Sequence, residues 1–95
     1  MVKYSVPERL DVSNSADVEK ELLLLANSEK PDLLVCDFSS TTYISSAGLR
    51  VMLLMTKHMK KEGGEFVLIR LQEQVLDVFK LAGFDSIMDI RESIE

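Results

Sequence analysis

Cysteine and histidine are almost absent from this sequence, which contains one of each. A single thiol, Cys36, cannot form an internal disulfide, so a reducing compartment is its natural setting. The lack of a Cys/His cluster argues against a metal centre, and we expect neither a metal nor another cofactor. No apolar run approaches the ~20 residues that cross a bilayer, and the first residues carry no apolar secretory signal. We therefore expect a cytoplasmic protein without direct membrane insertion.

Basic residues are also scarce relative to acidic ones, 11 against 16, which gives a net charge of −5. Nonspecific binding of nucleic acid needs a basic surface, so we expect no direct nucleic-acid contact. The chain has no Walker-type glycine loop and should not itself be an ATPase. Its 95 residues, 46% of them hydrophobic, suit one globular domain spanning residues 1–95.

Short apolar runs and helical periods predict the fold class. DLLVCDF at 32–38 and EFVLIR at 65–70 carry continuous apolar residues, as strands covered on both faces do, and Cys36 within the first should be an inert buried thiol. We also expect an edge strand at 2–6 and a last strand at 86–90. Helices are expected at 16–28, 46–62 and 72–83, with a frayed helical end at 91–95. The order predicts an α/β fold: a small mixed, mainly parallel sheet of about four strands packed with about three to four helices.

The loop between the second strand and the second helix, CDFSSTTYISSAGLR, contains six serine and threonine side chains. In parallel sheets, sites form where strands end and helices begin. Serine and threonine are also preferred helix caps, so Ser45 and Ser46 have a purely structural interpretation. One serine suffices for a cap, however, and the loop has a surplus.

A catalytic serine is the weaker alternative. The nucleophile elbow of serine hydrolases needs a glycine where this sequence has Ile44. The only histidine, His58, lies twelve residues beyond Ser46 on the same expected helix, roughly 18 Å away at 1.5 Å per residue. We therefore interpret His58 as a packing residue and do not expect an enzyme.

The expected helix has two distinct faces. At 100° per residue, the face away from the core carries Ser46, Arg50, Leu53 and Lys57, with Leu49 at its margin. This face is either simply solvated or a partner surface, and both interpretations stay open. A phosphate on Ser46 would add about two negative charges at a helix N-terminus, which favours anions. Gly48 either leaves room for a partner's backbone or allows close helix packing.

The segment DFSSTTYISSAGLRVMLLM resembles the signature of STAS domains, specifically of bacterial anti-sigma factor antagonists. ERLDVSNSADVEKEL is similar to the G-R-L-D segment that leads into the first helix of that family. EFVLIRLQEQVLDVFKLAGFDSIMDI is similar to its following strand, helix and final strand. The resemblance covers nearly the whole chain and implies a single STAS domain.

The resemblance also implies a mechanism. An unmodified antagonist binds an anti-sigma factor that is a serine kinase with a GHKL-type ATP site, and thereby frees a sigma factor. The kinase phosphorylates the serine two residues before the glycine, here Ser46, and a PP2C-type phosphatase resets the switch. Partner-binding residues by position are Asp11, Ser45, Gly48, Leu49, Arg50, Leu53 and Lys57.

Two departures from the family pattern bear on function. Many members have aspartate where this chain has Ser45, which makes Ser45 the alternate phosphoacceptor. The G-R-L-D segment is ERLD here, and the first hairpin is shortened. The alternative function is a constitutive STAS adaptor, for instance a subunit of a membrane lipid-transport ATPase, whose serine is only a helix cap.

Overall fold

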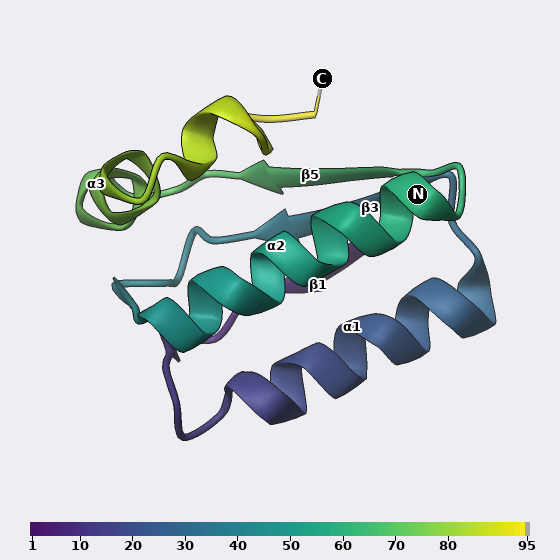
Figure 1. The fold of residues 1–95 in the computed structure, drawn as a ribbon, viewed down its shortest axis with the longest axis horizontal. Coiled ribbons are helices and arrows are strands. Elements are labelled where there is room, and N and C mark those ends of the chain that lie inside the picture. Colours follow the sequence, from purple (N-terminus) through teal and green to yellow (C-terminus); the bar gives the residue numbers. More distant parts are fainter. Residues whose placement is uncertain (95) are drawn as a thin grey trace.

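Four strands form one parallel sheet in the computed structural model, which describes residues 1–94. Their order is β1-β3-β5-β6, with β1 (Val2–Ser5) at one edge and β6 (Asp89–Arg91) at the other (Figure 1). The two central strands, β3 (Leu33–Asp37) and β5 (Glu65–Ile69), coincide with the continuous apolar runs. Every neighbouring pair in this sheet is parallel, so the predicted α/β fold with a mainly parallel sheet is confirmed.

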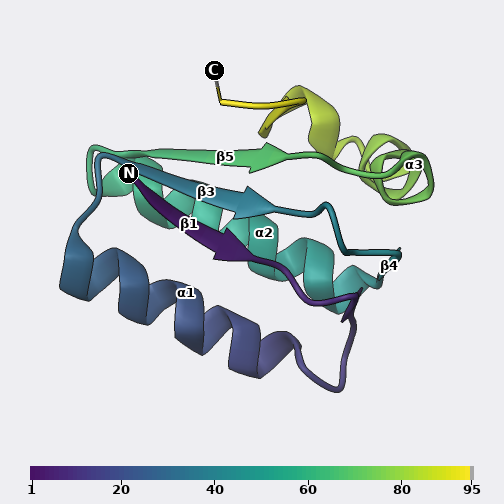
Figure 2. The same cartoon turned by 180° about the vertical axis from the view of Figure 1, so that it is seen from behind.

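Two helices lie side by side on one face of this sheet, α1 (Ser15–Glu29) and α2 (Ser46–Lys61) (Figures 1 and 2). Their buried side chains recur at helical spacing and pack against the sheet in one core, which includes Leu22 of α1 and Met52 and Met55 of α2. Figure 2 shows β1 and β3 in front of α2, with α1 alongside. A smaller buried cluster, Val35, Val67 and Ile69 with half-buried Leu33 and Ile94, lies apart from that core.

The chain between β5 and β6 forms α3 (Glu73–Leu81) and a short 3₁₀ helix, η1 (Phe84–Ser86). In Figure 1, α3 lies beyond the end of β5 and is seen along its axis. Phe79 of α3 packs edge-on against Phe38, with ring centroids 6.0 Å apart. This contact fixes α3 at the end of the sheet where the hydroxyl-rich loop begins.

The C-terminal prediction needs correction. The last strand occupies Asp89–Arg91, not 86–90, because η1 takes up the chain through Ser86. The frayed helical end expected at 91–95 is not found at 91–94, since Arg91 belongs to β6 and its carbonyl accepts a hydrogen bond from Arg70 N at 3.3 Å. Position 95 lies outside the described residues.

A second, two-stranded sheet was not predicted. It pairs β2 (Arg9–Leu10) with β4 (Tyr43–Ile44) in parallel, at the end of the molecule where α2 begins (Figure 2). We call it the β2–β4 ribbon. Leu10 and Ile44 are buried, whereas Arg9 and Tyr43 are exposed, as the alternation of a strand requires. The ribbon therefore has one face on the core and one in solvent.

Candidate functional site

The β2–β4 ribbon holds the first turn of α2 in place. The backbone N–H of Ser45, directly after β4, donates a hydrogen bond to the carbonyl oxygen of Leu10 over 2.9 Å. A Cβ atom on Gly48 would lie 2.8 Å from side-chain carbons of both Ile44 and Leu10, and 2.9 Å from the Leu10 carbonyl oxygen. Real Cβ atoms do not approach this closely. Gly48 is therefore required for the packing of α2 against the ribbon.

The hydroxyl groups of the loop differ in burial and in the hydrogen bonds that they make. Thr41 is buried, and its Oγ1 donates to the carbonyl oxygen of Pro7 at 2.9 Å, which ties the loop to the segment before β2. Ser45 is the N-cap of α2, and its Oγ accepts a hydrogen bond from Gly48 N at 3.4 Å. Ser46 is the first helical residue and is exposed. The predicted cap is thus confirmed for Ser45, and Ser46 is the serine of this pair that faces solvent.

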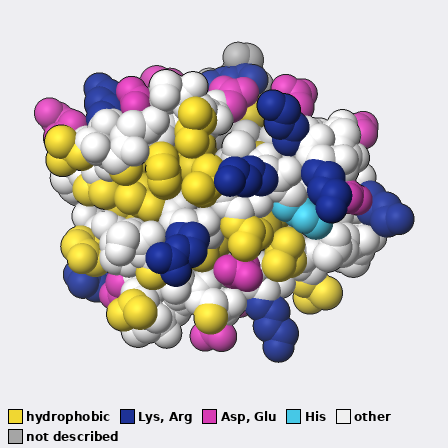
Figure 3. All heavy atoms as spheres, in the orientation of Figure 1, with side chains coloured by type: hydrophobic (Ala, Val, Ile, Leu, Met, Phe, Trp, Pro, Cys, Tyr) yellow, Lys and Arg dark blue, Asp and Glu magenta, His cyan; other side chains and the backbone are white. Residues whose placement is uncertain are grey.

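The outward face of α2 is exposed and basic. Arg50 and Lys57 are exposed and Leu53 is half-buried, on the same side of the helix as Ser46. The helix contains no aspartate or glutamate, although the whole chain carries a net charge of −5. Figure 3 shows basic side chains standing among hydrophobic ones on this side of the molecule.

Two of the predicted partner-binding residues are not on this surface. Gly48 is buried, and Leu49 is only 7% exposed. Both belong to the first turn, which packs against Leu10 and Ile44 of the ribbon. The interpretation of Gly48 as room for a partner's backbone is therefore replaced by close packing within the chain.

Asp11 lies beside the start of α2, because the Leu10 carbonyl that precedes it is bonded to Ser45 N. Its Oδ1 accepts hydrogen bonds from the hydroxyl of Ser13 at 2.6 Å and from Ser13 N at 3.0 Å. The Ser13 hydroxyl, followed by the Ser13 N–H and the charge of Arg9, lowers the pKa of Asp11 below its ordinary value. Asp11 is thus an ionised group that organises the turn into α1.

Arg9 and Tyr43 are neighbours of the site that the sequence analysis did not select. They face each other across the ribbon, and the Arg9 guanidinium carbon lies 4.4 Å from the centre of the Tyr43 ring. Tyr43 is 44% exposed, so part of its side chain is accessible to solvent. The two strands, RL and YI, are only two residues long, which is too short for a pattern to stand out in the sequence.

Asp37 closes the end of β3 at the beginning of the loop. It is buried, its Oδ1 accepts a hydrogen bond from Ser39 N at 2.9 Å, and its Oδ2 lies 3.2 Å from Lys3 Nζ. Burial alone would raise the pKa of Asp37, but the hydrogen bonds from Ser39 and the Lys3 ammonium outweigh it and lower the pKa. This aspartate anchors the loop to the sheet.

His58 is not placed to act as a base for Ser46. His58 lies three turns beyond Ser46 on one continuous helix, and its Nε2 is buried without a hydrogen-bond partner in residues 1–94. Over the same described residues, no three His, Cys, Asp or Glu side chains are grouped as metal ligands. No helix of residues 1–94 is both long and apolar enough to cross a membrane.

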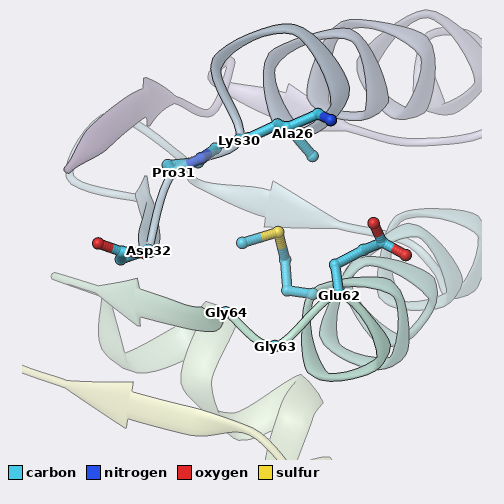
Figure 4. Close-up of a pocket in the computed structure, with 8 residues that line it drawn as sticks. Ala26, Lys30, Pro31, Asp32, Glu62, Gly63 and Gly64 are labelled. Atoms are coloured by element: carbon cyan, nitrogen blue, oxygen red, sulfur yellow. The ribbon is translucent and has the colours of Figure 1, made fainter.

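A small pocket lies at the opposite end of α2, where that helix, α1 and the start of β5 meet (Figure 4). Its volume is about 100 Å³, well below the ~300 Å³ at which sites for small organic ligands begin. The lining residues are Ala26, Lys30, Pro31, Asp32, Met59, Glu62, Gly63 and Gly64. Glu62, one of these residues, follows Ser46 by sixteen positions at the far end of α2, about 24 Å away at 1.5 Å per residue. The candidate site is therefore the exposed surface at the start of α2, not this pocket.

Comparison with known proteins agrees with this geometry. The family model described as STAS domain matches residues 1–95. BtrV of Bordetella bronchiseptica, a candidate anti-sigma factor antagonist, is 43% identical over 86 residues, which are 88% of this chain and 74% of that protein. The anti-sigma-B factor antagonist of Bacillus subtilis is 31% identical over 94 residues, covering 99% of this chain and 84% of that protein.

Solved structures share the fold. An anti-sigma factor antagonist from Mycobacterium paratuberculosis superimposes with a TM-score of 0.85 at 21% identity, covering 97% of this chain and 77% of that one. A sulfate transporter family protein from Wolinella succinogenes gives 0.81 at 13% identity, with coverages of 98% and 77%. The Bacillus cell fate determinant SpoIIAA in its phosphorylated form gives 0.71 at 13% identity, with coverages of 94% and 80%. At these identities the likeness concerns the fold alone.

Proposed function

The chain belongs to the STAS domain family, and on that premise we propose that it is an anti-sigma factor antagonist switched off by phosphorylation of Ser46. The unmodified protein binds an anti-sigma factor and so releases a sigma factor. Both curated relatives described above carry anti-sigma factor antagonist in their names. The proposal extends that activity to this chain and assigns the switch to one hydroxyl.

The observation that carries the proposal is that the two serines differ in role: Ser45 caps the helix, and Ser46 is exposed. Ser45 is half-buried, and its Oγ caps α2 by accepting from Gly48 N. Ser46 is exposed at the first helical position, next to the basic outward face with Arg50 and Lys57. A kinase can reach the Ser46 hydroxyl without disturbing the cap, which favours Ser46 over Ser45 as the phosphoacceptor.

A phosphate at Ser46 changes the surface without requiring a new fold. The N-terminus of α2 carries partial positive charge and free N–H groups, so it tolerates a dianion. The same dianion adds bulk and about two negative charges to a face that has no acidic residue of its own on α2. A partner that fits the basic face of the unmodified protein is then repelled. The switch is local electrostatics acting on a rigid surface.

The partners in this proposal are proteins. One is an anti-sigma factor that is also a serine kinase with a GHKL-type ATP site. The second is a PP2C-type phosphatase that removes the phosphate. The outward residues Arg50, Leu53 and Lys57 contact the kinase in the unmodified state.

A second candidate function is a constitutive adaptor with no phosphorylation. It is favoured by the similarity of the fold to the sulfate transporter family protein of Wolinella succinogenes, which shows that STAS-like domains also occur in transport proteins. An adaptor would use the same surface permanently, and Ser46 would be only a helical residue beside the cap.

Binding measurements on charge variants test the switch. The host's GHKL-type serine kinases are purified and titrated with the unmodified protein by calorimetry, and the one that binds is titrated with Ser46→Asp. Ser40→Asp is the matched control, because Ser40 is exposed in the same loop and the variant gains the same charge. We expect Ser46→Asp to weaken binding by about tenfold or more and Ser40→Asp to bind nearly as the unmodified protein does. Equal binding by both variants would contradict a switch at Ser46.

A further inference from the structure

The exposed face of the β2–β4 ribbon carries an arginine stacked on a tyrosine. Arg9 and Tyr43 are register partners, so the ladder places their side chains on the same side. The Arg9 guanidinium lies over the Tyr43 ring at 4.4 Å, and both are exposed, at 59% for the Arg9 side chain and 44% for the Tyr43 residue. Neither residue is needed for the core, because the inward positions of the ribbon are Leu10 and Ile44.

The pair is preorganised by the chain around it. Asn14 Nδ2 donates to the Arg9 carbonyl oxygen at 2.7 Å, and Asn14 Oδ1 accepts from Asp11 N at 2.9 Å. On the other strand, Tyr43 N donates to the Glu8 carbonyl oxygen at 3.4 Å. Both backbones are thus fixed before any partner arrives. A side chain that is already ordered loses less conformational entropy on binding.

Arg9 retains hydrogen-bonding capacity in this arrangement. Arg9 forms a loose ion pair with Asp11, in which Nε lies 3.5 Å from Oδ2, longer than the about 2.7–3.2 Å of a good N–H···O bond. A guanidinium has five N–H donors in a planar fork that matches a carboxylate. The Tyr43 ring covers one flat face of the guanidinium and leaves its N–H edge available. A carboxylate from another protein could therefore bind that edge.

The ribbon lies beside the proposed switch residue. Ser45 N is bonded to the carbonyl oxygen of Leu10, and Ser46 follows in the chain. The outward face of α2, with Arg50 and Lys57 and no acidic residue, continues the surface away from the ribbon. Along α2 the surface that a protein bound over Ser46 would meet is basic, whereas Glu8, Asp11 and the first turn of α1, with Asp17, contribute acidic side chains nearby. The complement of the α2 face is an acidic surface.

Building on the proposed function, we infer that Arg9 and Tyr43 form a docking anchor for the anti-sigma factor. A carboxylate of the anti-sigma factor binds the guanidinium fork, and an apolar or aromatic side chain covers the Tyr43 ring. Arginine and tyrosine are among the residue types enriched where binding energy concentrates at protein interfaces. The anchor and Ser46 contact the same partner side by side, so a phosphate on Ser46 acts next to the strongest contact.

The test compares variants of the anchor with a matched arginine elsewhere. Arg9→Ala and Tyr43→Ala are titrated against the purified GHKL-type kinase that binds the unmodified protein. Arg91→Ala is the control, because Arg91 is also exposed, at 46%, and also pairs with an aspartate two residues away, Asp89, at 2.7 Å. We expect about a tenfold or greater loss for Arg9→Ala and for Tyr43→Ala, and less than about a twofold change for Arg91→Ala. Arg9→Lys should lose affinity too, because an ammonium lacks the planar fork.

The possible outcomes distinguish a failure of the Arg9–Tyr43 anchor from a failure of the proposed function. Thermal unfolding of each variant checks that it is folded, which we expect because exposed cation–π contacts stabilise by only about 0.5–1 kcal/mol. If Ser46→Asp weakens binding while both anchor variants bind as the unmodified protein, the anchor is overturned and the switch stands. If the unmodified protein binds none of the host's GHKL-type kinases, the proposed function is overturned and the anchor with it.

Discussion

The carbonyl oxygen of Leu10 accepts a hydrogen bond from the backbone N–H of Ser45 over 2.9 Å. This bond joins the end of β2 to the residue that caps α2. Because Gly48 packs against the side chains of Leu10 and Ile44, the whole first turn of α2 is pressed onto the ribbon. The exposed Ser46 hydroxyl is therefore held in a fixed position relative to Arg9 and Tyr43. A rigid surface of this kind suits a switch that works by added charge.

The cap assignment predicts unequal costs for the two serines. Ser45→Ala removes the side chain that accepts from Gly48 N and should lower the free energy of unfolding by about 0.5–1 kcal/mol, near the low end for caps because the bond is long at 3.4 Å. Ser46→Ala removes an exposed hydroxyl and should cost less. Urea unfolding measures both values. A larger cost for Ser46→Ala would reverse the assignment.

Gly48→Ala should destabilise the protein even though alanine is the better helix former. Alanine gains roughly 1 kcal/mol of helix propensity over glycine. Its Cβ would meet Leu10 and Ile44 side-chain carbons at 2.8 Å and the Leu10 backbone oxygen at 2.9 Å, and overpacking of this kind costs about 1–3 kcal/mol. We expect a net loss in thermal and urea unfolding. Lys57→Ala, exposed on the same helix, is the control and should be nearly neutral. A Gly48→Ala protein more stable than the unmodified one would contradict the close packing.

The lowered pKa of Asp37 predicts that its contribution to the free energy of unfolding is lost in acid. Its hydrogen bonds from Ser39 N and its pairing with Lys3 lower its pKa in the folded protein despite burial, which acts in the opposite direction. A carboxyl with a lowered folded-state pKa stabilises the fold above its unfolded pKa of about 4, and the contribution disappears as pH falls through the folded value. The difference in unfolding free energy between the unmodified protein and Asp37→Asn should be constant near neutrality and shrink below about pH 4. A difference that stays constant down to pH 2.5 would contradict the ionised pair.

Cys36 should not react in the native state. The thiol is fully buried in β3, and burial raises its pKa above the ordinary value, so almost no thiolate is present at neutral pH. A disulfide reagent such as dithionitrobenzoate should label the folded protein very slowly and the urea-unfolded protein completely. Rapid labelling without denaturant would show that β3 opens or that the thiol is accessible.

Much of the fold was predictable because its elements carry local signals. The continuous apolar runs placed β3 and β5 to within one or two residues, and the helical period together with Gly63 and Gly64 placed α2 over 46–62 against the observed Ser46–Lys61. The C-terminal strand was displaced because the short turn of η1 has no periodic pattern to reveal it. Elements long enough to repeat a pattern were found, and shorter ones were not.

The site was only partly predictable for the same reason. Ser46, Arg50 and Lys57 follow from helical spacing alone, and the structure leaves them exposed. The burial of Gly48 and Leu49 was not predicted, because it depends on the ribbon, whose two-residue strands are more than thirty residues apart in the chain. Long-range pairing of so few residues leaves no periodic signal, and the exposed Arg9–Tyr43 pair depends on it entirely.

The central claim is that Ser46 receives a phosphate. Its most direct test is intact mass followed by peptide mapping of the protein purified from its native host under several growth conditions. The account predicts a fraction of molecules heavier by one phosphate, located on Ser46 and removed by a PP2C-type phosphatase. A phosphate located on Ser45 instead, or unmodified protein under every condition, would contradict the switch, and the second result would favour the constitutive adaptor.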